Sequence, residues 1–153
     1  MNIIGIIASA ISGHLGPPPA IAVSHDTSPF VTAYPWSGGF GTKYSNPASV
    51  PGGNGRGVAF KSQGDDIAVV NDGSPYIAAY PWSAGFGTKY ANPATLPGPF
   101  GRGVAFTSAG NDIGLATALT PFINAYPWSA GFGTKYADPA TLPAGNGYGV
   151  AFL

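Results

Sequence analysis

Aromatic and lysine side chains that recur three times are the residues in this chain best suited to bind a ligand. The segment AYPWSAGFGTKYA at residues 79–91 returns unchanged at 125–137 and as AYPWSGGFGTKYS at 33–45. An aromatic face beside a Lys and an Asn suits a polyhydroxylated molecule such as a sugar. The pattern therefore predicts shallow, repeated carbohydrate sites built from Trp36, Lys43, Tyr44, Trp82, Lys89, Tyr90, Trp128, Lys135 and Tyr136.

The same aromatic set has a second interpretation, which is packing between neighbouring units. Large rings bury well against one another, and lysine stems can cover them while the ammonium groups stay in water. We favour this interpretation. Replacing Trp82 with Ala separates the two, because loss of folding indicates packing, whereas a folded chain that no longer binds glycan indicates a site.

Side chains suited to catalysis are scarce. His14 and His25 are the only histidines, and both lie outside the repeated segment. A serine follows each tryptophan, but the second and third copies contain no His, so a Ser-His-Asp triad in each unit is impossible. The chain has no Cys, which excludes thiolate metal sites and a cysteine nucleophile. We predict a protein that is not an enzyme and holds no cofactor or metal.

Acidic residues fall where turns are expected. Calcium could use such oxygens, but the ligand spacing of an EF-hand is absent. Asp and Asn are also favoured in turns for their local hydrogen bonds alone. We interpret the following as turn residues: Asp26, Asp65, Asp66, Asp72, Asn111 and Asp112.

The composition favours short strands joined by many turns. Among 153 residues there are 24 Gly and 16 Pro, yet 44% of the residues are hydrophobic. Strong helix formers are sparse, while β-branched and aromatic residues carry the apolar segments. Charged residues make up 8% of the chain and the net charge is zero, so the basic face that a nucleic-acid binder needs is not expected.

A fixed step of 46 residues organises the chain. The three tryptophans follow this step, and so do the GVAF segments that begin at Gly57, Gly103 and Gly149. Repeats of this length form arrays in which one unit cannot bury its apolar face alone. We therefore expect a leader with a proline spacer at residues 1–19, followed by three repeat units at residues 20–153.

Each unit is predicted to hold four short antiparallel strands, which makes the fold all-β. Pro81 ends the third strand because it cannot donate a ladder hydrogen bond. The successive apolar residues of DIAVV and of AIAVS, which is expected as a strand at residues 20–24, indicate strands covered on both faces. In the second copy the strands are expected at residues 57–60, 66–70, 76–80 and 86–90.

The unit resembles a blade of a WD40-like β-propeller. DGSPYIAAY at residues 72–80 stands where that family has Asp-Gly, a spacer, alternating apolar residues and an aromatic. GVAFKSQGDDIAVV at residues 57–70 is similar to the first hairpin of such a blade. The resemblance covers residues 20–152 and implies three four-stranded blades in each chain.

The leader carries an apolar run that is shorter than the roughly 20 residues needed to cross a bilayer. Its sequence IIGIIASAISGHL resembles the N-terminal segment of many small structural proteins of tailed-phage virions. The resemblance implies a segment that docks onto other virion proteins, and the prolines at 17–19 then form a stiff spacer. The expected docking residues are Ile3, Ile4, Ile6, Ile7 and Ile11.

The phase of the repeat predicts a ring that is closed between chains. The first unit has prolines where its first strand should be, whereas an extra first strand, GVAF, follows the third unit. Propellers have about 4 to 8 blades, so we expect a homo-oligomer: a dimer with six blades is preferred, and a trimer with nine stays open. The strands expected to pair are Ala20, Ile21, Ala22 and Val23 of one chain with Gly149, Val150, Ala151 and Phe152 of another.

Two functions follow from these features. The preferred one is a non-enzymatic structural or adhesion component of a bacteriophage virion, with a cell-surface glycan as a further partner. The alternative is a free-standing, lectin-like propeller of bacterial or environmental origin. The leader discriminates between them, since its cleavage during export would favour the second.

Overall fold

The fold is all-β, as predicted. The computed structural model describes residues 17–153, and this part contains three antiparallel sheets and no helix, so it holds no helix that could cross a membrane. The docking residues predicted in the leader lie outside the described residues. The strands are β1 (Ala20–Ser24), β2 (Val31–Pro35), β3 (Gly55–Phe60), β4 (Asp66–Asn71), β5 (Ile77–Pro81), β6 (Gly101–Phe106), β7 (Asp112–Thr117) and β8 (Ile123–Pro127).

The sheets repeat one strand order, but the first sheet is incomplete. β3 pairs with β4 and β4 with β5, and β6, β7 and β8 repeat this arrangement. β1 pairs with β2 alone, although the 46-residue step makes β1 the counterpart of the central strands β4 and β7. Within the described part, the first sheet therefore lacks the strand that β3 and β6 supply to the other two.

Two tight turns join the strands of a unit. Between β3 and β4, Gly64 adopts a φ of 73° and its N–H donates to the Lys61 carbonyl at 2.8 Å. Glycine suits this corner because it enters the left-handed region without a steric penalty. Between β4 and β5, the Tyr76 N–H donates to the Gly73 carbonyl at 2.7 Å. The predicted hairpins are therefore present.

The predicted fourth strand is not formed. After β5 the chain coils, with φ values of 54° at Ala84 and 147° at Gly85, so that Trp82 and Phe86 meet in a single isolated bridge. Residues 86–90, which were expected to form the strand, take part in no ladder beyond this bridge. The complete sheets consequently have three strands and not the four expected of a blade.

The segment that was expected to be the fourth strand still lies at the sheet edge. The Tyr90 N–H donates to the Ala79 carbonyl of β5 at 2.9 Å, and the bond recurs at Tyr44 and Tyr136. Together with the bond from the Gly87 N–H to the Pro81 carbonyl at 2.8 Å, this bond holds the segment beside the third strand without building a ladder. It also fixes the tyrosine ring at the edge of the unit.

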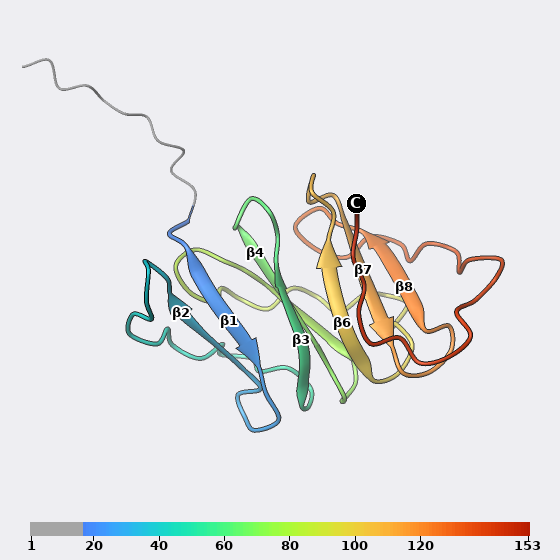
Figure 1. Cartoon of the computed structure of the whole chain (residues 1–153), viewed down its shortest axis with the longest axis horizontal. Helices are drawn as coiled ribbons and strands as arrows, with labels where there is room; N and C mark the ends of the chain where they lie inside the picture. Colours follow the sequence, from blue (N-terminus) through green and yellow to red (C-terminus); the bar gives the residue numbers. More distant parts are fainter. Residues whose placement is uncertain (1–16) are drawn as a thin grey trace, which may run out of the picture.

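The three sheets follow one another along the long axis of the molecule (Figure 1). Glycine allows the first strands of neighbouring units to approach closely. A Cβ at Gly57 would lie 2.9 Å from the Arg102 carbonyl oxygen, and a Cβ at Gly103 would lie 2.8 Å from the Gly149 Cα. Side chains at these positions would force the neighbouring backbones apart.

Residues 147–152 lie against the third sheet. Figure 1 shows this segment in dark red beside β6 and β7, and the Gly147 N–H donates to the Thr117 carbonyl at 2.9 Å. The Phe152 ring lies 3.0 Å from the position of a Cβ at Gly114. The segment thus occupies the place on the third sheet that β6 occupies on the second, but it forms no ladder with any described strand.

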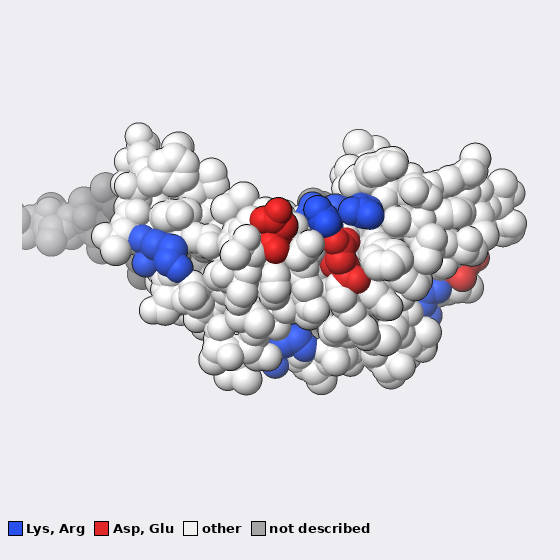
Figure 2. Space-filling model, turned by 90° about the horizontal axis from the view of Figure 1, so that it is seen from below, with Lys and Arg blue, Asp and Glu red and all other residues white. Residues whose placement is uncertain are grey.

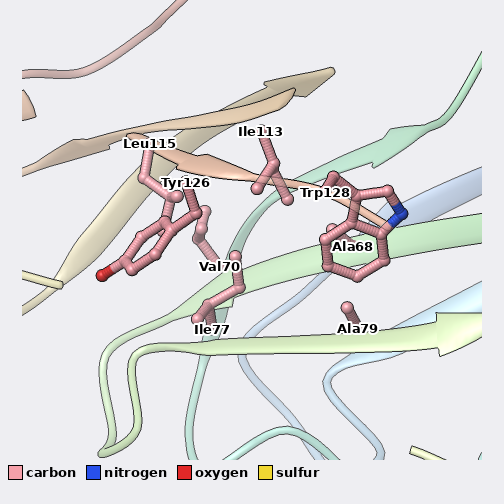
Figure 3. Packing of buried hydrophobic residues seen from close by; sticks show 8 residues of the cluster. All are labelled: Ala68, Val70, Ile77, Ala79, Ile113, Leu115, Tyr126 and Trp128. Atoms are coloured by element: carbon pink, nitrogen blue, oxygen red, sulfur yellow. The ribbon is translucent and has the colours of Figure 1, made fainter. Parts of the chain in front are cut away.

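The hydrophobic core is the interface between units. Figure 3 shows side chains of β7 and β8 pointing toward those of β4 and β5, and all eight labelled residues are at most 3% exposed. An equivalent cluster joins the first and second sheets through Val31, Ala33, Ile67, Val69, Ala78, Tyr80 and Trp82. Each unit is therefore stabilised by its neighbours, as expected for a repeat array.

Candidate functional site

The tryptophans at the two internal junctions are buried among other rings. Trp82 is 3% exposed, and its indole lies edge to face with Tyr44 of the preceding unit at a centroid distance of 5.1 Å. Phe60 and Phe86 of its own unit each lie at 5.1 Å as well. Each such pair contributes about 0.5–1.5 kcal/mol beyond the burial of area. Trp128, also 3% exposed, repeats the arrangement with Tyr90, Phe106 and Phe132.

A buried carboxylate ties the second junction together. Asp66 is 3% exposed, and its Oδ1 accepts a hydrogen bond from the Tyr90 hydroxyl at 2.7 Å. Its Oδ2 accepts one from Trp128 Nε1 at 2.9 Å, and the Lys61 ammonium lies 3.3 Å from the same oxygen. A buried charge needs such partners to offset its lost hydration. The interpretation of Asp66 as a turn residue is therefore wrong, because its side chain bridges two units.

The tyrosine hydroxyls in the core act as neutral donors. Burial raises the pKa of Tyr90, and the hydrogen bond to Asp66 and the charge of that carboxylate act in the same direction. Burial also raises the pKa of Tyr80, whose hydroxyl donates to the Ser49 carbonyl at 2.7 Å. The pKa of Tyr126 is raised by the same cause. These phenols stay protonated well above neutral pH.

The corresponding carboxylate of the third unit has only part of this network. Asp112 Oδ1 accepts a hydrogen bond from the Tyr136 hydroxyl at 2.7 Å, as Asp66 does from Tyr90. Among the described residues, however, no indole makes to Asp112 the bond that Trp128 makes to Asp66. Tyr136 is 49% exposed. The third unit therefore presents Tyr136 and Asp112 with no indole packed against them among the described residues.

Trp36 has nearly the same sequence neighbours as the other two tryptophans but a different environment. It is 40% exposed, and Phe40 is its one ring neighbour among the described residues, at 5.2 Å. Phe40 is itself 69% exposed. The first unit therefore presents a tryptophan that no tyrosine or carboxylate of a preceding unit contacts in the described part of the chain.

The far face of the third unit is open. A hollow of about 220 Å³ lies there, lined by Ile123, Asn124, Ala125, Ala137, Asp138 and Pro139. The corresponding residues of the second unit, Ile77 and Ala79, are buried beneath the third unit. The hollow is thus the surface that a following unit covers at the internal junctions.

The predicted carbohydrate set is divided between the core and the surface. Trp82 and Trp128 are too buried to offer a ring face to a ligand, which leaves Trp36 as the exposed indole. Each lysine ammonium donates to the side chain three residues further on, in the pairs Lys43 with Asn46, Lys89 with Asn92, and Lys135 with Asp138. Burial lowers the pKa of Lys89. Carbohydrate binding by the exposed members stays a prediction.

No protein-family model matches the chain, and no curated protein matches it. The likeness to WD40-like blades and to phage leader segments consequently rests on the residues quoted above and stays a prediction.

The other polar candidates have local structural partners. His25 Nε2 lies 2.9 Å from Thr32 Oγ1, and Asp72 pairs with Arg56 on its own unit and lies 3.7 Å from Arg102 on the next. Residues 17–153 hold no group of three or more residues that could bind a metal ion. Figure 2 shows few charged side chains, of both signs, on an otherwise uncharged face.

Sequence reasoning placed the tryptophans in equivalent positions but missed Asp66 as a bridge between units and Asp112 as its counterpart. The signal was present in the repeat. Asp66 and Asp112 are one step of 46 residues apart, and Ala20 occupies the corresponding position in the first unit. A carboxylate shared by two units but absent from a third is unusual for a turn residue. Only the fold, however, brings Asp66 beside an indole 62 residues away.

Proposed function

We propose that this protein is a non-enzymatic structural or adhesion component of a bacteriophage virion, assembled from several copies into a closed ring of β-sheet units. The observation that carries the proposal is that, within residues 17–153, the first sheet lacks one strand, while a segment with the sequence of that strand lies unpaired on the third sheet. The first sheet has two strands and lacks a first strand. Residues 147–152 lie on the third sheet as a first strand without ladder partners in the described part.

The two incomplete ends together make one unit. Residues 149–152 repeat the GVAF sequence of β3 and β6, and β1 and β2 are the counterparts of β4 and β5. Pairing of residues 149–152 of one chain with β1 of another would make the two-stranded first sheet a complete, three-stranded sheet. It would also cover the free edge of β1, and exposed sheet edges otherwise promote aggregation.

The number of units sets the size of the assembly. Each chain contributes three units, so a dimer has six and a trimer nine. Six lies inside the range of about 4 to 8 blades that is usual for propellers, which makes the dimer our preferred assembly. Both rings use the same head-to-tail contact.

The use of the aromatic set supports a structural role. Two of its tryptophans, Trp82 and Trp128, hold units together at the internal junctions, where each is 3% exposed. A set used in this way builds a stiff array and does not leave a reaction site at each unit. The assignment to a virion rests on the resemblance of the leader to phage segments. That resemblance implies docking through Ile3, Ile4, Ile6, Ile7 and Ile11.

Electron microscopy of native particles that carry this chain tests the proposal. The expected result is a ring of six or nine units at the particle surface. Chains that lack residues 1–14 should still form the ring but should no longer join the particle. Recovery of the chain free in the medium with its leader cleaved, and absent from particles, would replace this proposal with the lectin-like alternative.

A further inference from the structure

We infer that Trp36 of one copy completes the open site of a second copy, lying between Tyr136 and Phe152 and donating its indole N–H to Asp112. This contact, called the joint below, rests on the self-assembly proposed above and specifies its chemistry. The occupant of the open face is thus a second copy of this chain.

The internal junctions supply the geometry of the joint. At the second junction Trp128 lies between Tyr90 and Phe106, with ring centroids at 5.3 and 5.4 Å, and bonds to Asp66. The residues that stand 46 positions after these three partners are Tyr136, Phe152 and Asp112. The tryptophan that corresponds to Trp128 in the first unit of a second copy is Trp36. The joint therefore continues the ring packing of both internal junctions and the indole–carboxylate bond of the second.

The rings of the joint are more exposed than their counterparts at the internal junctions, where the tryptophans are buried and the tyrosines and phenylalanines are partly buried. Trp36, Tyr136 and Phe152 are 40%, 49% and 39% exposed, whereas Trp82 and Trp128 are each 3% exposed. Large apolar groups gain about 25 cal/mol for each Å² removed from water. Association of the two ends would bury all three rings at once.

The apolar faces of the two ends also correspond. Ile21 and Val23 are 39% and 50% exposed on β1, while their counterparts Ile113 and Leu115 are fully buried against the second unit. The surface that would receive them is the hollow of about 220 Å³ beside Ile123. Ile21 and Val23 of a second copy would thus pack against this hollow as Ile113 and Leu115 pack against the second unit.

The register of the joint follows from β3 and β4. Ala59 lies opposite Ala68, and Phe60 lies opposite Ile67. The same pairing places Ala151 opposite Ala22 and Phe152 opposite Ile21 of the second copy. The Tyr126 hydroxyl donates to the Thr95 carbonyl inside the chain. The corresponding residues at the joint are Tyr34 of the second copy and Thr141, so the Tyr34 hydroxyl would donate to the Thr141 carbonyl.

A matched pair of sequence changes favours a second copy over an unrelated partner. Lys61 pairs with the buried carboxylate of Asp66 inside the chain. At the joint the corresponding residues are Leu153 and Ala20, both apolar. The joint therefore brings no unpaired charge into the interface at these two positions.

Gly149 gives an independent indication. A Cβ at Gly57 or at Gly103 would meet the backbone of the next first strand within 3 Å, but a Cβ at Gly149 meets nothing within 4 Å. The joint places the β3 of the second copy beside Gly149. Replacing Gly149 with Ala should therefore leave the separate chain folded and weaken its association.

The test measures association of the full chain by light scattering over a dilution series. Trp36→Phe keeps an aromatic ring but removes the N–H, and Asp112→Asn removes the charge that accepts it. Each variant should raise the dissociation constant at least about tenfold, because hydrogen bonds to charged groups are strong. The double variant should have no larger a dissociation constant than the weaker-binding single variant, because both substitutions remove the same hydrogen bond. Lys43→Ala, an exposed change in the same segment, should leave the constant unchanged.

Cross-linking fixes the register, and the chain has no cysteine of its own to interfere. An equimolar mixture of Ala22→Cys and Ala151→Cys chains should form mixed disulfide dimers, since directly opposed residues in a ladder are within disulfide reach. A mixture of Ala22→Cys and Val150→Cys should not, because neighbouring side chains point to opposite faces.

The outcomes separate this inference from the proposed function. If the chain assembles but the first mixture fails to cross-link, or if Trp36→Phe and Asp112→Asn weaken association additively, the joint is wrong while self-assembly stands. If the unmodified chain stays monomeric at every concentration, the proposed self-assembly fails and the joint fails with it.

Discussion

Trp82 and Trp36 show how neighbouring units determine the role of a residue. The segments around them differ at only two positions, yet Trp82 is 3% exposed and Trp36 is 40% exposed. Trp82 receives Tyr44 from the unit before it, whereas Trp36 has no such ring among the described residues. The same side chain is therefore a core residue at a junction and an exposed aromatic at the end of the array.

The central strands make the same comparison at the level of the backbone. Every residue of β4 is buried, while β1 alternates between intermediate and exposed positions. Their sequences, DIAVVN and AIAVS, are similarly apolar, and both were predicted to be covered on two faces. The structure confirms this prediction for β4 only. β1 has a neighbouring unit on one side alone, so Ile21 and Val23 stay in contact with solvent.

The largest expected effect comes from removing an internal tryptophan. Trp128→Ala should lower the free energy of unfolding by about 3–5 kcal/mol, because it leaves a cavity between three rings and removes a donor to Asp66. Urea denaturation followed by circular dichroism measures the change. An unchanged midpoint would show that the junction does not hold the units together.

Trp36→Ala is the matched control for that variant. In dilute, dissociated chains it should change the free energy of unfolding by less than about 1 kcal/mol, since the indole is 40% exposed. At concentrations where the chain associates it should destabilise the assembly. Denaturation midpoints over a hundredfold range of concentration separate the two effects, and a large loss at every concentration would contradict the comparison.

The two carboxylates provide the next contrast. Asp66→Asn should cost about 1.5–3 kcal/mol, because two donors and the Lys61 ammonium lose a charged acceptor in a buried place. Asp112→Asn should cost less in the dissociated chain, where the Tyr136 hydroxyl is the one side-chain donor to the carboxylate among residues 17–153. Equal losses in urea denaturation at low concentration would mean that burial does not distinguish the two sites.

High pH should weaken the junctions. The pKa of Tyr90 is raised in the folded chain, so the folded state holds the phenolic proton more tightly than the unfolded state does. Its contribution to stability is complete below the ordinary tyrosine pKa of about 10 and is lost as pH rises through the folded value. Urea midpoints at pH 8, 10 and 11 should fall only above pH 10. Tyr90→Phe should show a shallower fall, and identical slopes would exclude this tyrosine as a cause.

The smallest effect is expected at the surface lysines. Lys43→Ala removes an exposed hydrogen bond to Asn46 and should change the free energy of unfolding by less than about 0.5 kcal/mol. Glycan-array binding measured on the same variant tests the carbohydrate prediction separately. Loss of glycan binding with unchanged stability would give the exposed lysines a role that packing does not explain.

The sequence by itself determined the repeat and its local structure. The step of 46 residues placed the tryptophans in equivalent positions, and turn residues such as Gly64 fixed the hairpins. These features are local, since strand propensity, proline and left-handed glycine act over a few residues. The strand AIAVS was predicted with the bounds that β1 has, Ala20–Ser24.

Tertiary structure alone decided which copy of each residue is buried and which is open. The sequence could not exclude the fourth strand, because FGTKY has residues suited to a strand. The coil that precedes it, at Ala84 and Gly85, is visible only in the structure. The bridge from Asp66 to Trp128 spans 62 residues and exists only because neighbouring sheets stack. Contacts between units depend on what lies beside each unit in space, and identical sequence segments can therefore have different environments.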